Sequence, residues 1–290
     1  MSSAESSRLP VRTAFLVSGE GSTAEAATHA VQEGRLTGIE PVLFLSSDPN
    51  AGALQKAERL NVPTAVVNSR DYPGRGTDPG MKRRFGIAIN NELAAAGAEL
   101  VVQAGWMPLT PSDVIQRYRN RIINQHPAPL DPGKVDSRMH GTDGVDFGGR
   151  GMHGEQAHAA VLAYAMTTGS LNHTEATTHY VEERFDTGKL VSVAPMALDL
   201  PSEQIDLDEL RTNPHVQADL KERAEALASQ LLPVEHQNLI DTLALAGADF
   251  GSFARGRGTL YTRRDLLIPV DKRAHLAAVK DVVVSLYKKK

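Results

Sequence analysis

The stretch TAFLVSGEGST, residues 13–23, decides the fold because an apolar run leads directly into a glycine-bearing turn. Residues 13–17 have the continuous apolar character of a buried strand, and residues 23–34 show the spacing expected of a helix. The same alternation repeats through the first half of the chain. Strands alternating with helices at this spacing predict an α/β fold with a doubly wound, mostly parallel sheet. Further strands are predicted at 41–45, 63–67, 100–103 and 121–124, and helices at 51–60, 81–96 and 112–118.

The second half of the chain has a different character. Residues 131–155 are rich in Gly, Asp and His, and a loop of this length inside a compact domain is usually functional or disordered. The expected organisation is a disordered leader at 1–10, one large domain at 11–247 with an insert at about 131–158, and a basic C-terminal extension at 248–290. Beyond the insert, we predict helices at 156–168, 217–231 and 234–245, strands at 176–181 and 190–195, and a hairpin around 256–258.

Composition limits the class of protein. The 290 residues include no cysteine, which excludes disulfides, zinc–thiolate sites and thiol nucleophiles. The sequence has neither the apolar core of a signal peptide nor a run long enough to cross a membrane, so we expect a cytoplasmic protein without a membrane partner. The net charge of −4 argues against nucleic acid as a partner. Residues 255–290 carry ten Lys or Arg and three Asp or Glu, a local net charge of +7, which we interpret as a solvated tail.

The glycine-bearing turn at residues 18–23 is compatible with three interpretations. Backbone N–H groups at the start of a helix attract phosphate, so the turn is a candidate monophosphate site. Extended to Ala24, it also fits the dinucleotide pattern G-x-G-x-x-A, in which Asp48 would contact a ribose hydroxyl. That pattern keeps an NAD-dependent oxidoreductase as an alternative of another class. In the third interpretation, the glycines only allow the turn to pack closely against its neighbours.

Two short polar motifs, NQHP at residues 124–127 and DTG at residues 186–188, follow predicted strands. Asn124 and His126 are two positions apart, so on an extended chain their side chains point to the same side. An amide, an imidazole and a carboxylate such as Asp186 can together stabilise an oxyanion and move a proton, which are the needs of acyl transfer to an amine. Each motif alone has an ordinary structural explanation, because Asp and Gly are common in turns.

Histidines in the glycine-rich loop raise the question of a metal. His140, His153 and His158 lie near Asp143 and Asp146, but their spacing matches no established ligand pattern. We therefore predict no metal, and we interpret the loop as a lid or a substrate-binding segment.

Six segments, in order, resemble the folate-dependent formyltransferases. The specific part is Asn-x-His-Pro followed by a later Asp-x-Gly, each after a strand. The glycine turn and Glu235 favour the branch that acts on glycinamide ribonucleotide. The resemblance implies a Rossmann-like formyltransferase fold with a catalytic domain at 11–247. The segments are VSGEGS (17–22), AGWM (104–107), RIINQHP (121–127), TTHYV (177–181), FDTG (185–188) and VEH (234–236).

The resemblance also implies roles for individual residues. Asn124, His126 and Asp186 would form the catalytic set. The small-molecule partners would be glycinamide ribonucleotide and 10-formyltetrahydrofolate, and a homodimer stays open. Residues implied for the ribonucleotide are Gly19, Glu20, Gly21, Ser22, Thr23 and Glu235, with one of Lys82, Arg83 and Arg84 as the phosphate's positive partner. Residues implied for the folate are Trp106, Met107, Leu109, His179, Val181 and Glu182.

The chain departs from the usual family pattern at several points. Thr23 stands where asparagine is usual, and the chain from His126 to Asp186 is longer than in typical members. These departures lie near the acceptor, so formylation of another amine, such as an amino sugar, remains an alternative. Hydrolysis of 10-formyltetrahydrofolate by the same three residues is a second alternative.

Overall fold

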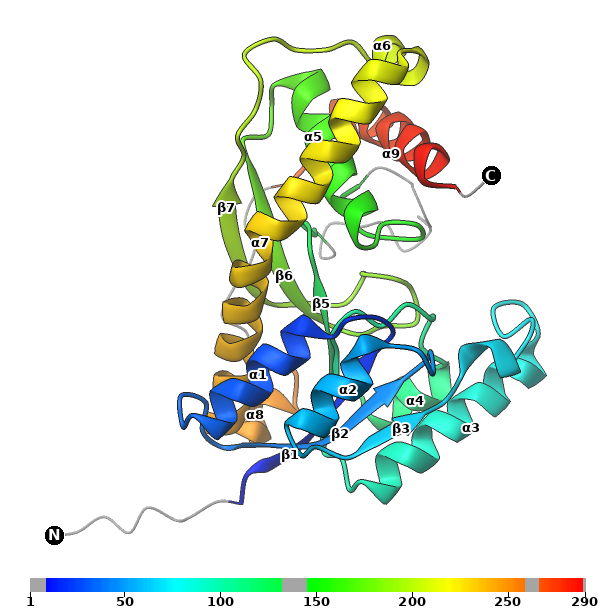
Figure 1. Cartoon of the computed structure of the whole chain (residues 1–290), viewed down its shortest axis with the longest axis vertical. Coiled ribbons are helices and arrows are strands. Elements are labelled where there is room, and N and C mark those ends of the chain that lie inside the picture. The colour runs from blue at the N-terminus through cyan, green and yellow to red at the C-terminus, as the bar shows by residue number, and fades with distance from the viewer. Residues whose placement is uncertain (1–8, 132–144, 259–265, 289–290) are drawn as a thin grey trace, which may run out of the picture. The chain divides into compact units, whose positions relative to one another are not determined.

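The computed structural model describes residues 9–131, 145–258 and 266–288 (Figure 1). Its strands form one sheet in the order β3-β2-β1-β4-β5-β6-β7. Pairing is parallel from β3 through β2 and β1 to β4, and antiparallel from β5 through β6 to β7. The predicted α/β fold with a mostly parallel sheet is confirmed. The strands are β1 (Val11–Val17), β2 (Ile39–Ser46), β3 (Thr64–Val66), β4 (Leu100–Gln103), β5 (Ile122–His126), β6 (His173–Tyr180) and β7 (Leu190–Ala197).

The chain divides into two compact units. Unit 1 comprises Met1–Ile122 and Leu239–Gly258, and unit 2 comprises Ile123–Asn238 and Thr259–Lys290. This division does not test the domain boundaries expected at residues 10 and 247, which stay predictions. The leader residues 1–8, residues 132–144 of the insert, residues 259–265 and residues 289–290 lie outside the described part of the chain.

Unit 1 is a doubly wound half-sheet. Its strands are continuous apolar runs because helices cover both faces, and all four residues of β4 are buried. The chain runs outward from β1 through β2 to β3, and then crosses back to place β4 on the other side of β1. Since each parallel crossover is right-handed, α1 and α2 cover one face and α3 covers the other. The helices are α1 (Ser22–Gln32), α2 (Gly52–Arg59), α3 (Pro79–Ala95) and α4 (Ser112–Arg117), with a 3₁₀ turn at Ser69–Asp71.

Unit 2 packs helices against the antiparallel strands β5, β6 and β7. Helix α5 is buried along almost its whole length, which explains why it is apolar on every side. It contacts α9, and both contribute to one core together with Leu220, Ala224 and Leu227 of α7. Figure 1 shows α9 beside α5, although the two are far apart in sequence. The helices are α5 (Glu155–Thr168), α6 (Leu207–Thr212), α7 (Pro214–Ala248) and α9 (Arg273–Tyr287), with a 3₁₀ turn at Val270–Lys272.

Helix α7 corrects one prediction. The sequence predicts two helices, 217–231 and 234–245, on either side of Pro233, but the structure has one helix, Pro214–Ala248, with Pro233 inside it. A proline removes one hydrogen bond and disturbs one turn, and it breaks a helix only where packing on both sides does not hold the chain. Here Leu231 before Pro233 and Asn238 after it are both buried.

The C-terminal region corrects two more predictions. Instead of a hairpin around 256–258, the chain forms the short helix α8 (Phe250–Phe253) and a turn in which Gly256 has a φ of +69°. The prediction that residues 255–290 form a solvated tail is also wrong. Helix α9 buries Leu276, Val279 and Val283, and Lys280 is completely buried among them.

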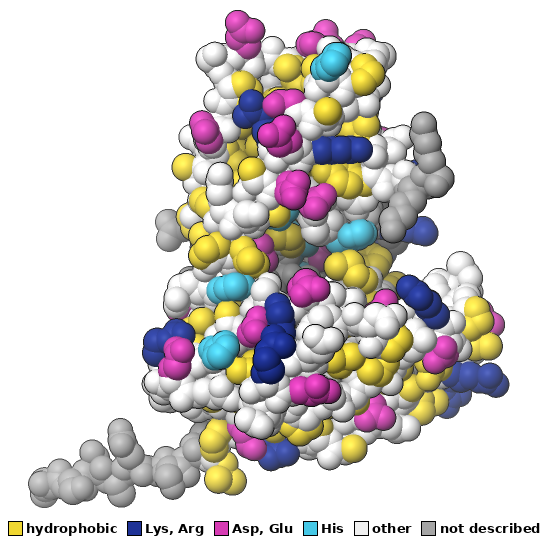
Figure 2. Space-filling model, in the orientation of Figure 1, with side chains coloured by type: hydrophobic (Ala, Val, Ile, Leu, Met, Phe, Trp, Pro, Cys, Tyr) yellow, Lys and Arg dark blue, Asp and Glu magenta, His cyan; other side chains and the backbone are white. Residues whose placement is uncertain are grey.

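The surface mixes charges of both signs. On the face drawn in Figure 2, Lys and Arg side chains of the described residues are interspersed with Asp and Glu. Among the described residues, no helix is long and apolar enough to cross a membrane.

Gly21 offers a test of the turn that begins α1. Its φ is +62°, and a Cβ atom there would lie 2.5 Å from the Cβ of Ala53. We expect Gly21→Ala to lower the free energy of unfolding by about 2–4 kcal/mol, from the left-handed backbone and the overlap together. Urea denaturation measures this change. Gly19→Ala is the matched control, because its Cβ would meet nothing within 4 Å. Equal losses in both variants would contradict this account.

Candidate active site

The pairing of β5 with β6 brings three polar side chains to one face of the sheet. Asn124 lies opposite His179, and His126 lies opposite Thr177, in antiparallel register. Side chains of directly opposed residues point to the same face, and so do those two apart on one strand. The structure therefore places Asn124, His126 and His179 together, and Asn124 Nδ2 lies 3.1 Å from His179 Nε2.

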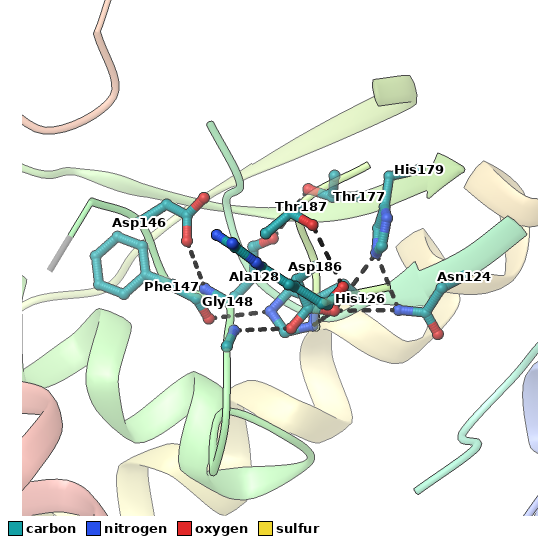
Figure 3. Close-up of polar contacts among 12 residues, drawn as sticks. Asn124, His126, Ala128, Asp146, Phe147, Gly148, Thr177, His179, Asp186 and Thr187 are labelled. Atoms are coloured by element: carbon teal, nitrogen blue, oxygen red, sulfur yellow. Dashed lines mark hydrogen bonds and ion pairs between the residues drawn. The ribbon is translucent and has the colours of Figure 1, made fainter. Parts of the chain in front are cut away.

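Asp186 reaches this face from the connection between β6 and β7. Its φ of +57° is left-handed, a conformation that Asp adopts more readily than most residues. The side chain is only 8% exposed, and its Oδ1 lies 3.4 Å from His179 Nε2 and 3.7 Å from His126 Nδ1. Asn124 Nδ2 is 3.5 Å from the same oxygen. Figure 3 shows these side chains converging on the carboxylate.

Residues 147–149, within the insert, complete the surroundings of the cluster. His126 Nε2 donates to the carbonyl of Phe147 at 3.0 Å, because a carbonyl can only accept. The backbone N–H of Gly149 donates to Asp186 Oδ2 at 2.9 Å. On the opposite side, His179 Nδ1 donates to the carbonyl of Tyr180 at 2.8 Å. Both rings are thereby fixed, each with its other nitrogen toward Asp186 (Figure 3).

The electrostatics of the cluster favour an ionised Asp186. Burial opposes its charge, but the charge of His126 and hydrogen bonds from His179 and Gly149 outweigh burial and lower the pKa of Asp186 to about 2. Burial, with the charge of His126, lowers the pKa of His158 to about 4. The same two causes lower the pKa of His153. At neutral pH the site thus combines one carboxylate with at least one uncharged imidazole beside it.

Helix α7 supports the rear of the β5–β6 pair. Buried Asn238 donates to the carbonyl of Ala176 at 3.2 Å and to Thr178 Oγ1 at 3.0 Å, and Thr178 donates to Gln125 Oε1 at 2.8 Å. Glu235 lies one turn earlier on the same helix. It is partly exposed, and burial raises the pKa of its carboxyl to about 7.

The residues predicted to hold a phosphate lie in unit 1, at the end of β1. The carbonyl of Gly19 accepts from the N–H of Ala53, and Ser18 Oγ accepts from the N–H of Met107 at 2.9 Å. The β1 turn is thereby tied to the segment after β4, at the reversal of strand order where open α/β sheets bind ligands. Of the remaining predicted residues, Glu20 is exposed, Ser22 is partly buried, Thr23 is buried, Lys82 is partly buried, and Arg83 and Arg84 are exposed.

The residues predicted to line the folate site are divided between the two units. In unit 1, Trp106 is buried and its ring stacks on Phe85 with centroids 6.2 Å apart. Met107 follows with 49% of its surface exposed, and Leu109 is partly buried. In unit 2, His179 belongs to the Asp186 cluster described above. Val181 is partly exposed and Glu182 is exposed.

The structure also bears on the candidate metal residues and on the candidate dinucleotide residue Asp48. Among residues 9–131, 145–258 and 266–288, no three His, Asp or Glu side chains are grouped as a metal site requires. His140 and Asp143 lie outside the described residues. Asp48, the residue that would contact the ribose of a dinucleotide, instead accepts from the N–H of Asn50 and lies 3.6 Å from the guanidinium of Arg70.

Sequence reasoning missed the contributors behind the cluster. The Phe147 carbonyl and the Gly149 N–H are backbone atoms, which carry no residue-type signal. Gly148 was a partial signal, because a Cβ there would lie 2.7 Å from both Asp186 Cβ and Leu130 Cδ2. A glycine pair next to a loop aspartate can mark such a close approach.

Comparisons with known proteins agree with this fold. Residues 11–133 match the family described as formyl transferase. The chain is 27% identical over 196 residues to the chloroplastic phosphoribosylglycinamide formyltransferase of Arabidopsis thaliana, covering 66% of this chain and 58% of that protein. It is 26% identical over 181 residues to the trifunctional purine biosynthetic protein adenosine-3 of Gallus gallus, covering 62% of this chain and 15% of that protein. The chain thus spans less than two thirds of the length of these relatives.

Solved structures show the same fold. Glycinamide ribonucleotide transformylase 1 of Symbiobacterium toebii superposes with a TM-score of 0.59 at 23% identity, covering 86% of this chain and 89% of that one. The phosphoribosylglycinamide formyltransferase of Bacillus halodurans superposes with a TM-score of 0.58 at 22% identity, covering 83% of this chain and 97% of that one. The formyltransferase fold inferred from the short motifs is confirmed.

The low pKa of Asp186 predicts how stability depends on pH. Its folded-state pKa of about 2 lies below the ordinary 3.8, so its contribution is present above pH 4 and is lost as pH falls toward 2. The shift corresponds to about 2 kcal/mol. Asp186→Asn keeps the left-handed backbone accessible and removes the titration. In urea unfolding at pH 7, 4 and 3, the wild type should lose more stability than the variant. Parallel losses would contradict this assignment.

Proposed function

We propose that this chain, whose residues 11–133 match the formyl transferase family, transfers a formyl group from 10-formyltetrahydrofolate to the amine of glycinamide ribonucleotide. The observation that supports the proposal best is the convergence of Asn124, His126 and Asp186. These are the residues that the resemblance assigns to catalysis, and they lie within 3.7 Å of a shared carboxylate oxygen. The named relatives, which act in purine synthesis, add weight to this acceptor.

Asn124 is suited to stabilise the oxyanion that forms when the amine attacks the formyl carbon. Its amide nitrogen carries two hydrogens, and the contact with His179 Nε2 occupies one. The other points toward Asp186 Oδ1 at 3.5 Å, a long and weak contact that a developing oxyanion could replace. A fixed donor of this kind acts where charge develops in the transition state. His126 would act as a second donor through Nδ1 when its ring is protonated.

Asp186 is suited to accept the proton that the attacking amine must lose. It is ionised at neutral pH, as its pKa of about 2 requires. The proton would travel from the amine to this carboxylate through a water, and then to the folate nitrogen as the carbon–nitrogen bond breaks. 10-Formyltetrahydrofolate supplies the activated formyl carbon. The chain's own residues supply the oxyanion donors and the proton path.

The substrates would be held by residues outside the cluster. The N–H groups at the start of α1 are suited to a phosphate, and Lys82 is a partly buried cation on α3 without an ion-pair partner in the described part of the chain. Glu235 would accept hydrogen bonds from ribose hydroxyls. In unit 1, the exposed apolar side chain of Met107 suits contact with a pterin ring.

A formyl-transfer assay tests the proposal. Purified protein is mixed with 10-formyltetrahydrofolate, with and without glycinamide ribonucleotide, and folate absorbance is followed. Turnover only with the ribonucleotide supports the proposal. Turnover without an amine would indicate hydrolysis, and turnover only with an amino sugar nucleotide would assign another acceptor. Either of these results would overturn the proposed acceptor.

Asn124→Ala should lower kcat by about 10²–10³-fold, because it removes one oxyanion donor. Asp186→Asn should lose at least as much, because the amide cannot accept the proton. Far-UV circular dichroism serves as the folding control for both. Near wild-type turnover in either folded variant would exclude the role assigned here.

The raised pKa of Glu235 predicts that the affinity for the ribonucleotide depends on pH. A pKa of about 7 leaves Glu235 mostly protonated at pH 6, and hydroxyls donate stronger hydrogen bonds to the ionised carboxylate than to the neutral acid. Binding should therefore tighten about tenfold from pH 6 to pH 8. Calorimetric titration of wild type and Glu235→Gln checks this, because the variant has the same shape and cannot ionise. An identical pH profile in both proteins would rule out a role for this carboxyl.

A further inference from the structure

Lys280 is an unusual residue in this fold. It lies on α9, near the end of the described chain, and its side chain is completely buried. Lysine is almost never fully buried unless its ammonium group has partners. Its Nζ donates to the carbonyl of Asp146 at 2.9 Å and to the carbonyl of Gly148 at 2.7 Å. A side chain of α9 therefore binds backbone carbonyls within the insert.

The segment 146–149 has two sides with different partners. Its carbonyls at Asp146 and Gly148 face Lys280, whereas the carbonyl of Phe147 between them accepts from His126 Nε2 at 3.0 Å. The N–H of Gly149, in the same peptide group as the Gly148 carbonyl, donates to Asp186 Oδ2 at 2.9 Å. Lys280 thus fixes two alternate carbonyls of a backbone whose other polar groups hold His126 and Asp186, two members of the candidate catalytic set.

Other contacts also hold this segment. Phe147 is fully buried and donates its N–H to the carbonyl of Pro129 at 3.2 Å. Asp146 Oδ1 accepts from the N–H of Gly148, and its Oδ2 accepts from the N–H of Asp131, both at 2.9 Å. Burial raises the pKa of Asp146, and the charge of Lys280 opposes that rise. Removing the ammonium group would leave two buried carbonyls without this donor, and a buried acceptor that loses its donor incurs the full desolvation penalty.

We infer that Lys280 is a positioning residue for the transfer reaction, and that it orients His126 and Asp186 through the backbone of residues 146–149. The inference rests on the proposed function for its kinetic consequence. It assigns to the C-terminal helix a direct part in the geometry of the site, in addition to its part in the core of unit 2.

Lys280→Met in the full chain is the first test, because methionine keeps the apolar stem and removes the donor. A displacement of about 1 Å at a reacting group can cost about 100-fold in rate. We expect kcat to fall by about 10–100-fold, with KM for both substrates changing less than about threefold. Lys272→Met is the matched control, since Lys272 is exposed at the start of the same helix. It should keep wild-type rates.

A second readout does not depend on turnover. The His126 Nε2–H proton, bonded to the Phe147 carbonyl, should give a protected imidazole resonance in ¹H–¹⁵N spectra of the wild type. It should shift or broaden in Lys280→Met and stay unchanged in Lys272→Met. If the wild type transfers no formyl group, the proposed function fails while this spectrum still decides the positioning role.

Gly148→Ala covers the case in which Lys280→Met does not fold. A Cβ there displaces the same segment from the side of Asp186, without altering α9. It should lower kcat and perturb the His126 resonance in the same way. Unchanged kcat and an unchanged His126 resonance in a folded Lys280→Met or Gly148→Ala variant would overturn the inference.

Discussion

The burial of the Asp186 carboxylate is the constraint around which unit 2 is arranged. A charge removed from water must receive hydrogen bonds or opposite charge, or it becomes protonated. Here the partners come from β5, from β6 and from the N–H of Gly149, so three separate parts of the chain are fixed by one side chain. The left-handed backbone of Asp186 fits this account, because local strain persists only where surrounding contacts determine it.

The second layer of contacts gives the cluster its rigidity. Asn238 of α7 joins β5 and β6 from behind, and Lys280 of α9 joins the 146–149 backbone. Under the proposed function, neither residue needs to touch a substrate to influence the chemistry, because each fixes the backbone or side chains of the cluster. The C-terminal region contributes a packed helix to the core of unit 2.

Much of unit 1 was predictable from the sequence, because parallel strands buried on both faces read as apolar runs. Residues 100–103 are the clearest case, and the predicted limits are those of β4. The meeting of Asn124 with His126 followed from strand periodicity alone. The convergence of Asp186 on them did not, since the register of β5 and β6 and the path of the β6–β7 connection are tertiary properties. The family resemblance supplied that link.

The failures have specific physical causes. Pro233 signals a break that packing overrides. Helix α9 does carry an apolar pattern at Leu276, Val279 and Val283, but the surrounding positive charge suggested a solvated tail. Lys280 is indistinguishable in sequence from an exposed lysine, because only its buried carbonyl partners give it a role.

The late position of α9 in the chain has a consequence for synthesis in the cell. A ribosome that adds about 5–20 residues per second makes Lys280 roughly 8–30 s after His126. During that interval the strands of unit 1 can pair, while the 146–149 backbone still lacks its ammonium partner. A nascent or prematurely terminated chain would thus hold its motif residues in full and yet leave them imperfectly aligned. Alignment of the motif residues would therefore follow the synthesis of α9, well after the motif residues themselves have been made.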